Sequence, residues 1–240
     1  MFKITKFEVK KIFNGKAFGI LSLILILLTI FTFIALRHSK ISGNELLFNT
    51  FASSGIEIIL AIIIPIVMCS DFENKAFRLI IGRGFTKNKY LSGKVLTITI
   101  LTIGLSLISL FTAAILYLKS GKTEKITNLY IDKIALILLV QLGFASVYMV
   151  ISLVVKKKGG AIALNILLPM MISLLLPLLD KLLKNGMKKS ISGYWISSIP
   201  QKIADMGTLD QNTIEIFVVL IIYCIIGYLL NNILIRRTEI

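Results

Sequence analysis

The chain has 240 residues, of which 56% are hydrophobic and only 16% are charged, and its mean hydropathy is +0.89. A soluble domain of this size has about 25% charged residues, so the composition excludes an ordinary cytosolic enzyme and a disordered chain. The 27 lysines and arginines outnumber the 12 acidic residues, for a formal net charge of +15. A nucleic-acid-binding protein has no need of so apolar a chain, so the sequence predicts an integral membrane protein that binds no nucleic acid.

The first 16 residues predict a basic amphipathic helix. If this segment is helical, Phe2, Val9 and Phe13 share one stripe, and Lys6 and Lys10 lie on another side. Segments of this kind lie in the headgroup region with their apolar face toward the acyl chains. An unstructured basic tail that only fixes the orientation of the protein is the alternative.

Six later segments predict membrane-spanning helices, since each has the roughly 20 apolar residues that cross a bilayer. None of them contains lysine or arginine, and they comprise residues 17–36, 51–70, 95–118, 134–155, 161–179 and 214–235. The alternating pattern of a β-barrel is absent. The sequence therefore predicts an all-α fold with a single transmembrane domain over residues 1–240. Pro65, Pro169 and Pro177 lie inside spans, where each removes a backbone donor and tends to kink its helix.

The distribution of basic residues predicts the orientation of the bundle. With the N-terminus inside, the inner segments hold 16 lysines and arginines among 50 residues, and the outer segments hold 11 among 63. Cytoplasmic loops carry the excess of basic residues in membrane proteins. Both termini are therefore predicted to be cytoplasmic, with residues 71–94 as the longest inner loop and residues 180–213 as an extracellular loop.

The chain lacks the residues that several kinds of chemistry require. His38 is its only histidine, and no HExxH or CxxC motif occurs, so no bound catalytic metal is expected. Gly121-Lys122-Thr123 resembles the end of a P-loop, but this chain has Leu116 where a P-loop has its first glycine. We therefore expect no enzyme activity and no cofactor bound by this chain.

The longest inner loop predicts a docking element. Phe72, Leu79 and Ile80 share one face of a helix, which Gly82 and Gly84 then break. A linker between two spans needs only a few polar residues, so a short helix with an apolar face indicates a partner. The alternative is an interfacial helix that only lies on the bilayer.

The order of these elements and the segment from Pro65 to Lys94 resemble the membrane-spanning subunit of type-2 ATP-binding-cassette (ABC) exporters. The residues that fit the family pattern are Glu73, Arg78, Arg83-Gly84, Thr86-Lys87 and Lys94. Ala76 and Phe77 stand where the family usually has Gly-Thr. The short chain is similar to the subgroup that exports bacteriocins, lantibiotics or phenol-soluble-modulin toxins, or gives immunity to them, in Gram-positive bacteria.

The resemblance implies a role for both inner elements. The first helix would be an elbow along the inner membrane surface, and residues 72–81 would form a coupling helix that docks on a separate ABC ATPase subunit. ATP and Mg²⁺ would bind to that ATPase, and the permease would dimerise with a second copy or a paralogue. The residues implied in the ATPase contact are Phe72, Glu73, Lys75, Arg78, Leu79, Ile80, Arg83 and Gly84. Thr86 is in addition a predicted N-cap of the third span.

Four residues are candidates for a substrate path. Glu57 is the only acid well inside a predicted span, and a carboxylate there more often faces a cavity than lipid. It would attract cationic peptides, unless it lies near the outer interface and reaches water. Gln141 and Asn165 are polar residues within spans, which more often form interhelical hydrogen bonds. Trp195, beside Tyr194, suits a loop segment that dips into the outer interface. This segment either caps the exit of the path or only anchors the loop.

We therefore expect a multi-pass permease subunit in the plasma membrane that exports hydrophobic or amphipathic peptides. One alternative is a stand-alone immunity or channel-like membrane protein without an ATPase. The other is an ABC exporter of lipids or small-molecule drugs.

Overall fold

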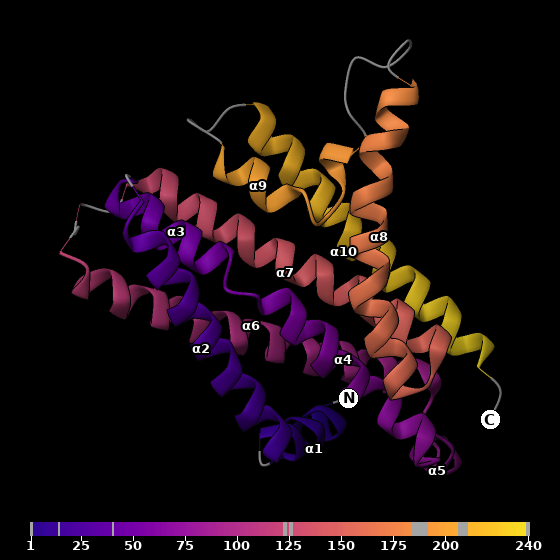
Figure 1. Cartoon of the computed structure of the whole chain (residues 1–240). Coiled ribbons are helices and arrows are strands. Elements are labelled where there is room, and N and C mark those ends of the chain that lie inside the picture. The colour runs from indigo at the N-terminus through magenta and orange to yellow at the C-terminus, as the bar shows by residue number, and fades with distance from the viewer. Residues whose placement is uncertain are drawn as a thin grey trace.

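The computed structural model describes residues 2–13, 15–39, 41–121, 124, 127–183, 192–205 and 211–238. Its helices are α1 (Phe2–Phe13), α2 (Lys16–Arg37), α3 (Gly43–Ala52), α4 (Ile56–Glu73), α5 (Ala76–Gly82), α6 (Lys87–Lys119), α7 (Asn128–Val155), α8 (Lys158–Leu183), α9 (Ile199–Ala204) and α10 (Gln211–Arg237), with a 3₁₀ turn η1 (Ser192–Tyr194) before α9 (Figure 1). These ranges contain no strand, which confirms the predicted all-α class.

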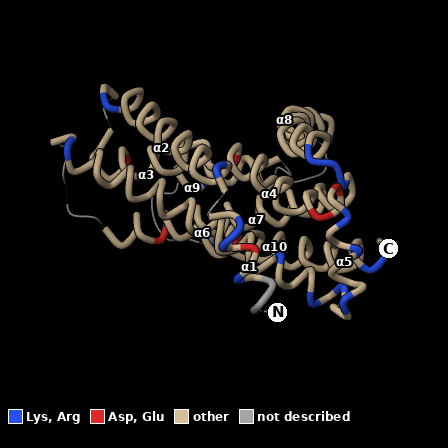
Figure 2. The backbone as a smooth tube through the Cα atoms, turned by 90° about the horizontal axis from the view of Figure 1, so that it is seen from below, with Lys and Arg blue, Asp and Glu red and all other residues tan. Residues whose placement is uncertain are grey.

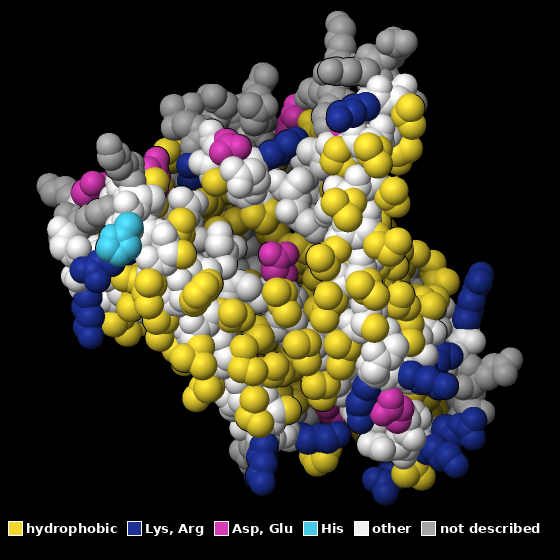
Figure 3. All heavy atoms as spheres, in the orientation of Figure 1, with side chains coloured by type: hydrophobic (Ala, Val, Ile, Leu, Met, Phe, Trp, Pro, Cys, Tyr) yellow, Lys and Arg dark blue, Asp and Glu magenta, His cyan; other side chains and the backbone are white. Residues whose placement is uncertain are grey.

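Six helical stretches are long and apolar enough to cross a membrane, namely α2, α3 with α4, α6, α7, α8 and α10. This number confirms the prediction from the sequence. Large apolar side chains remain exposed along α2, α8 and α10, and the space-filling view shows a broad apolar face (Figure 3). Apolar surface of this extent marks contact with a membrane, so the chain is a membrane protein.

The second span consists of two helices. α3 starts with a capping box, in which the side chain of Ser42 accepts from the backbone N–H of Glu45 and the Glu45 carboxylate accepts from the N–H of Ser42. Gly55 then has a φ of 73°, a conformation that favours glycine, and α4 begins at the next residue. The predicted helix over 51–70 is therefore not continuous, because its first two residues end α3 and residues 53–55 separate α3 from α4.

α4 is the centre of the bundle. Eleven of its 18 residues are buried, and it packs against α2, α6, α7 and α8. On the far side of α7, α10 packs closely, since a Cβ added at Gly227 would lie 2.6 Å from the hydroxyl oxygen of Ser146. Small residues allow membrane helices to approach in this way.

α8 is attached to the bundle by one stripe. Its buried residues Ala161, Asn165 and Pro169 are spaced four apart in its first half, where α8 contacts α4 and α7. In its second half Leu174 and Leu182 are exposed, and Figure 1 shows α8 running steeply along one side of the bundle. Most of the surface of α8 is therefore available to lipid or to a partner.

The two ends of the described chain lie at the same end of the bundle, beside α1 and α5 (Figure 1). The ammonium of Lys87 at the start of α6 donates to the carbonyl of Thr238, at 2.6 Å, which fastens the C-terminal residues there. We call this the terminal end. Lysines and arginines gather around α5 and the last turn of α10 at this end (Figure 2).

The predicted helix over 72–81 is interrupted in the structure. α4 continues to Glu73, Lys75 has a φ of 56°, and α5 starts at the following residue in a new direction. A left-handed residue ends the hydrogen-bonding pattern of a right-handed helix, and this break was not visible in the apolar spacing. The third span begins as predicted, because the side chain of Thr86 accepts from the N–H of Lys89 at 3.3 Å.

Candidate functional site

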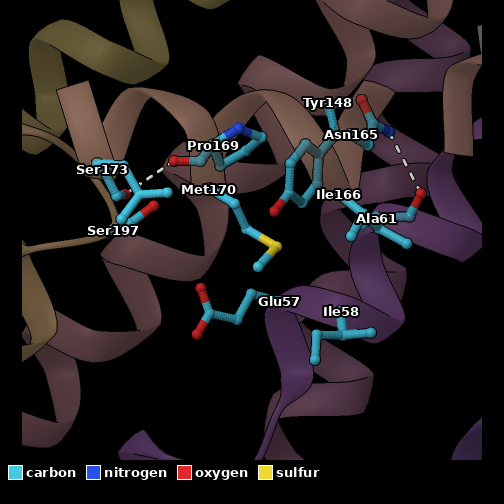
Figure 4. Close-up of a pocket in the computed structure, with 11 residues that line it drawn as sticks. Glu57, Ile58, Ala61, Tyr148, Asn165, Ile166, Pro169, Met170, Ser173 and Ser197 are labelled. Atoms are coloured by element: carbon cyan, nitrogen blue, oxygen red, sulfur yellow. Dashed lines mark hydrogen bonds between the residues drawn. The ribbon is translucent and has the colours of Figure 1, made fainter. Parts of the chain in front are cut away.

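A pocket of about 510 Å³ opens between α4, α7 and α8, toward the end of the bundle opposite the terminal end. In the space-filling view an acidic side chain lies in a hollow of the apolar surface (Figure 3). Most of the pocket lining is apolar, and the lining residues are Glu57, Ile58, Ala61, Tyr148, Asn165, Ile166, Pro169, Met170, Ser173, Leu174 and Ser197 (Figure 4). The pocket therefore combines a large apolar wall with one charge.

Glu57 provides that charge. It lies in the first turn of α4, where the partial positive charge of the helix N-terminus stabilises a carboxylate. Its side chain is half-buried and points into the pocket beside Met170 (Figure 4). Among the described residues it has no ion pair and no hydrogen bond. A cation that enters the pocket therefore meets an unpaired carboxylate in surroundings that screen charge poorly.

Asn165 lies in the same pocket wall, and the reason for its position is Pro65. In a regular helix, residue 65 would donate its N–H to the carbonyl of Ala61, but proline has no N–H. The side-chain amide of Asn165 on α8 donates to that carbonyl instead, at 3.3 Å. Asn165 is fully buried, and its own carbonyl oxygen has no partner among the described residues. The proline of one span thus leaves free the carbonyl to which another span is attached.

We expect Asn165→Leu to lower the free energy of unfolding by about 1–3 kcal/mol, because it leaves the Ala61 carbonyl buried and unpaired. Denaturation of the purified protein in detergent measures this cost. In a Pro65→Ala background, residue 65 regains an N–H that can donate to Ala61, so the same substitution should cost less. An equal cost in both backgrounds would show that Asn165 does not replace the missing helix bond.

The other two path candidates lie elsewhere. Trp195 does not line the pocket, but its indole N–H donates to the hydroxyl of Ser173 in the pocket wall, at 3.1 Å. Gln141 is buried between α6 and α7, where its side-chain oxygen accepts from the hydroxyl of Ser106. The structure therefore brings Glu57 and Asn165 together, places Trp195 behind the wall, and uses Gln141 in an interhelical hydrogen bond.

A second feature lies at the terminal end, where three separate segments meet at one buried lysine. The ammonium of Lys94 on α6 lies 2.9 Å from the carboxylate of Glu8 on α1 and 2.7 Å from that of Asp71 on α4. It also donates to the carbonyl of Val67, at 3.0 Å, and is fully buried. The hydroxyl of Tyr90 donates to Asp71 at 3.0 Å. We call Glu8, Asp71, Tyr90 and Lys94 the ionic cluster.

Sequence reasoning missed the ionic cluster. In the sequence, Lys94 stands out only as the last residue of the family pattern, and neither Glu8 nor Asp71 stands out. The predicted apolar stripe of α1 is not its packed face: Thr5 and Glu8 are buried against the bundle, whereas Phe13 is 46% exposed. The side chain of Phe2 lies outside the described residues. One signal was available, because Glu8 is the only acid among the 16 residues of the predicted elbow.

The residues implied in an ATPase contact divide into two groups. Glu73 is engaged within the chain, since its carboxylate accepts from the backbone N–H of Lys158 at 2.7 Å and lies 3.1 Å from the ammonium of the same residue. Phe72 and Ile80 pack partly against the core. The exposed members are Lys75, Arg78, Leu79, Arg83 and Gly84. α5 therefore presents a basic surface with one apolar side chain.

No group of three or more histidine, cysteine, aspartate or glutamate side chains gathers among the described residues in a way that could hold a metal ion. Comparison with protein-family models found no matching family, and comparison with curated proteins found no significantly similar sequence.

Proposed function

We propose that this chain is the permease subunit of an ATP-driven ABC exporter, with the terminal end in the cytoplasm. The observation that supports this function best is the two-sided structure of α5. Phe77 is only 2% exposed, and its ring lies 5.0 Å from that of Phe72 and 5.1 Å from that of Tyr90. On the outer side Leu79 is 64% exposed, next to Arg78. A short helix anchored on one side and exposed on the other suits docking in a groove of a partner protein.

The ionic cluster supports a mechanism for this function. Asp71 lies five residues before α5, and its partners are Lys11 on α1 and Tyr90 and Lys94 on α6. A partner that moves α5 therefore acts on the ends of three helices through close polar contacts. ATP binding to a separate ATPase would favour one arrangement of these helices over another, which is a population shift between two states of the bundle.

The pocket indicates the class of cargo. Its apolar wall suits the apolar side of an amphipathic peptide, and the carboxylate of Glu57 suits a cationic side chain. We propose that this pocket receives hydrophobic or amphipathic peptides, such as a toxin or bacteriocin, on their way out of the cell or the membrane. The same apolar wall also favours a second candidate, an exporter of lipids or small drugs.

The test is co-purification with an ABC ATPase, sought first among the products of the neighbouring genes. We expect Leu79→Asp combined with Arg78→Asp to abolish capture of that ATPase, because a new charge in a docking groove lacks a partner. Lys89→Asp is the matched control, since Lys89 is also exposed at the terminal end but lies outside α5. Full capture by the double variant would remove α5 from the interface. If none of the neighbouring genes encodes an ATPase, the alternative function, a stand-alone immunity or channel-like membrane protein, is favoured.

A further inference from the structure

A second pocket, of about 410 Å³, lies at the terminal end between α5 and the turn that joins α7 to α8. Lys75 and Arg78 line it from the α5 side, and Lys156 and Lys157 line it from the turn. These segments are about 80 residues apart in the sequence, yet each contributes two bases to one cavity. The pocket borders Val155, the last residue of a membrane-spanning helix, so it lies at the boundary between membrane and water. We call it the basic pocket.

The backbone of the basic pocket is unusual. Among the described residues, the only non-glycine residues with positive φ are Lys75, at 56°, and Lys156, at 58°. Both lie in this pocket, and both are positions where glycine would avoid the steric penalty of a left-handed conformation. Turns at the ends of α4 and α7 need no lysine for their geometry. Two strained lysines that face one cavity therefore indicate that the charge has a use.

The charges of the basic pocket are not compensated within the described part of the chain. Glu73 is the one acid in its lining, and its carboxylate is engaged by Lys158 outside the pocket. Lys75, Arg78, Lys156 and Lys157 form no ion pair with any described carboxylate. Four cations at close quarters repel each other, so an anion between them would stabilise the arrangement.

The other wall of the basic pocket is apolar. Phe72 and Phe77 line it, with ring centroids 5.0 Å apart. A free anion needs only the bases, whereas a molecule with a phosphate and an adjoining hydrocarbon part uses both walls. Anionic phospholipids have this chemistry, and basic pockets between the ends of membrane helices bind their headgroups.

We propose that the basic pocket binds the headgroup phosphate of an anionic phospholipid, with the glycerol and first acyl carbons against the partly exposed ring of Phe72, which Phe77 supports from behind. Lys156 and Lys157 belong to this site alone, whereas Lys75 and Arg78 are also among the residues that the family resemblance implies in the ATPase contact. The proposed lipid site does not require the terminal end to be cytoplasmic, so it does not depend on the proposed function.

The glycine variants provide a specific test. Lys75→Gly with Lys156→Gly removes two of the four charges and at the same time relieves the strained backbone. The protein is reconstituted in vesicles of phosphatidylcholine or of phosphatidylglycerol, and its Tm is measured in each. We expect phosphatidylglycerol to raise the Tm of the wild type, because a ligand that binds only the folded state stabilises it. The double variant should lose this rise, while its Tm in phosphatidylcholine equals or exceeds that of the wild type.

Controls separate the site from general attraction to a charged surface. Lys89→Ala removes an exposed base of the terminal end outside the pocket, and it should keep the full rise. Native mass spectrometry should find phosphatidylglycerol bound to the wild type and to Lys89→Ala, but not to the double variant. The proposal is overturned if the double variant keeps the rise, or if Lys89→Ala loses as much of it. The assignment to a lipid is overturned if inorganic phosphate raises the Tm in phosphatidylcholine as much as phosphatidylglycerol does. It is also overturned if the pocket lysines are protected from chemical labelling by purified ATPase but not by phosphatidylglycerol.

Discussion

Lys94→Met is expected to lower the free energy of unfolding by about 3–5 kcal/mol, which is the usual cost of removing one partner from a buried ion pair. The substitution leaves the carboxylates of Glu8 and Asp71 facing each other in a buried site. Lys11 compensates little for the missing charge, because its ion pair with Asp71 is 4.0 Å long and its side chain is 51% exposed. Denaturation in detergent and proteolysis of the N-terminal helix measure the effect.

A compensated variant separates loss of charge balance from loss of the side chain. When Glu8→Gln and Asp71→Asn accompany Lys94→Met, no unpaired charge remains, so most of the stability should return. Lys89→Met is the matched control on the same helix, since Lys89 is exposed and should change the stability by less than about 0.5 kcal/mol. If Lys94→Met is as mild as this control, then the ionic cluster does not stabilise the junction of α1, α4 and α6.

Glu57→Gln is expected to weaken the binding of a cationic amphipathic peptide about tenfold or more, because a charged hydrogen bond contributes about 1.5–3 kcal/mol. Trp195 is the only tryptophan of the chain, and it donates to Ser173 in the pocket wall. Its fluorescence therefore reports binding of a peptide without tryptophan through this contact with Ser173. This measurement needs no ATPase.

Two comparisons give the Glu57 result its meaning. Glu57→Asp keeps the charge and should retain most of the affinity, whereas a neutral peptide of the same length should bind the wild type and Glu57→Gln equally. If both peptides lose affinity together, Glu57 acts through the shape of α4 and not through its charge. Equal and tight binding of neutral lipids or drugs to both proteins would favour the second candidate cargo.

The number of spans followed from the sequence, because a bilayer requires long apolar segments and excludes lysine and arginine from them. The break between α3 and α4 could not be predicted, because Ser53, Ser54 and Gly55 interrupt the apolar pattern no more than other small residues do. The helix predicted over 72–81 starts too early for a similar reason, since α5 begins only at Ala76. Lys75 adopts a left-handed conformation that its residue type does not announce.

The candidate site was predictable only where one residue was unusual by itself. Glu57 was visible as a lone acid in a span, and the structure places it in a pocket. The role of Asn165 depends on Pro65, which lies 100 residues earlier, and no local pattern joins the two. Glu8 and Asp71 looked like ordinary polar residues of a tail and a loop, because only the fold brings them to Lys94.

The ionic cluster also sets an order for the assembly of the protein during its synthesis. Glu8 and Asp71 emerge from the ribosome before Lys94, and neither carboxylate can enter an apolar site while its counter-charge is missing. The first two spans must therefore enter the membrane while the N-terminal segment stays at the aqueous interface. α1 takes its final place only once the third span has delivered its lysine, so a chain truncated before residue 94 should leave Glu8 open to solvent.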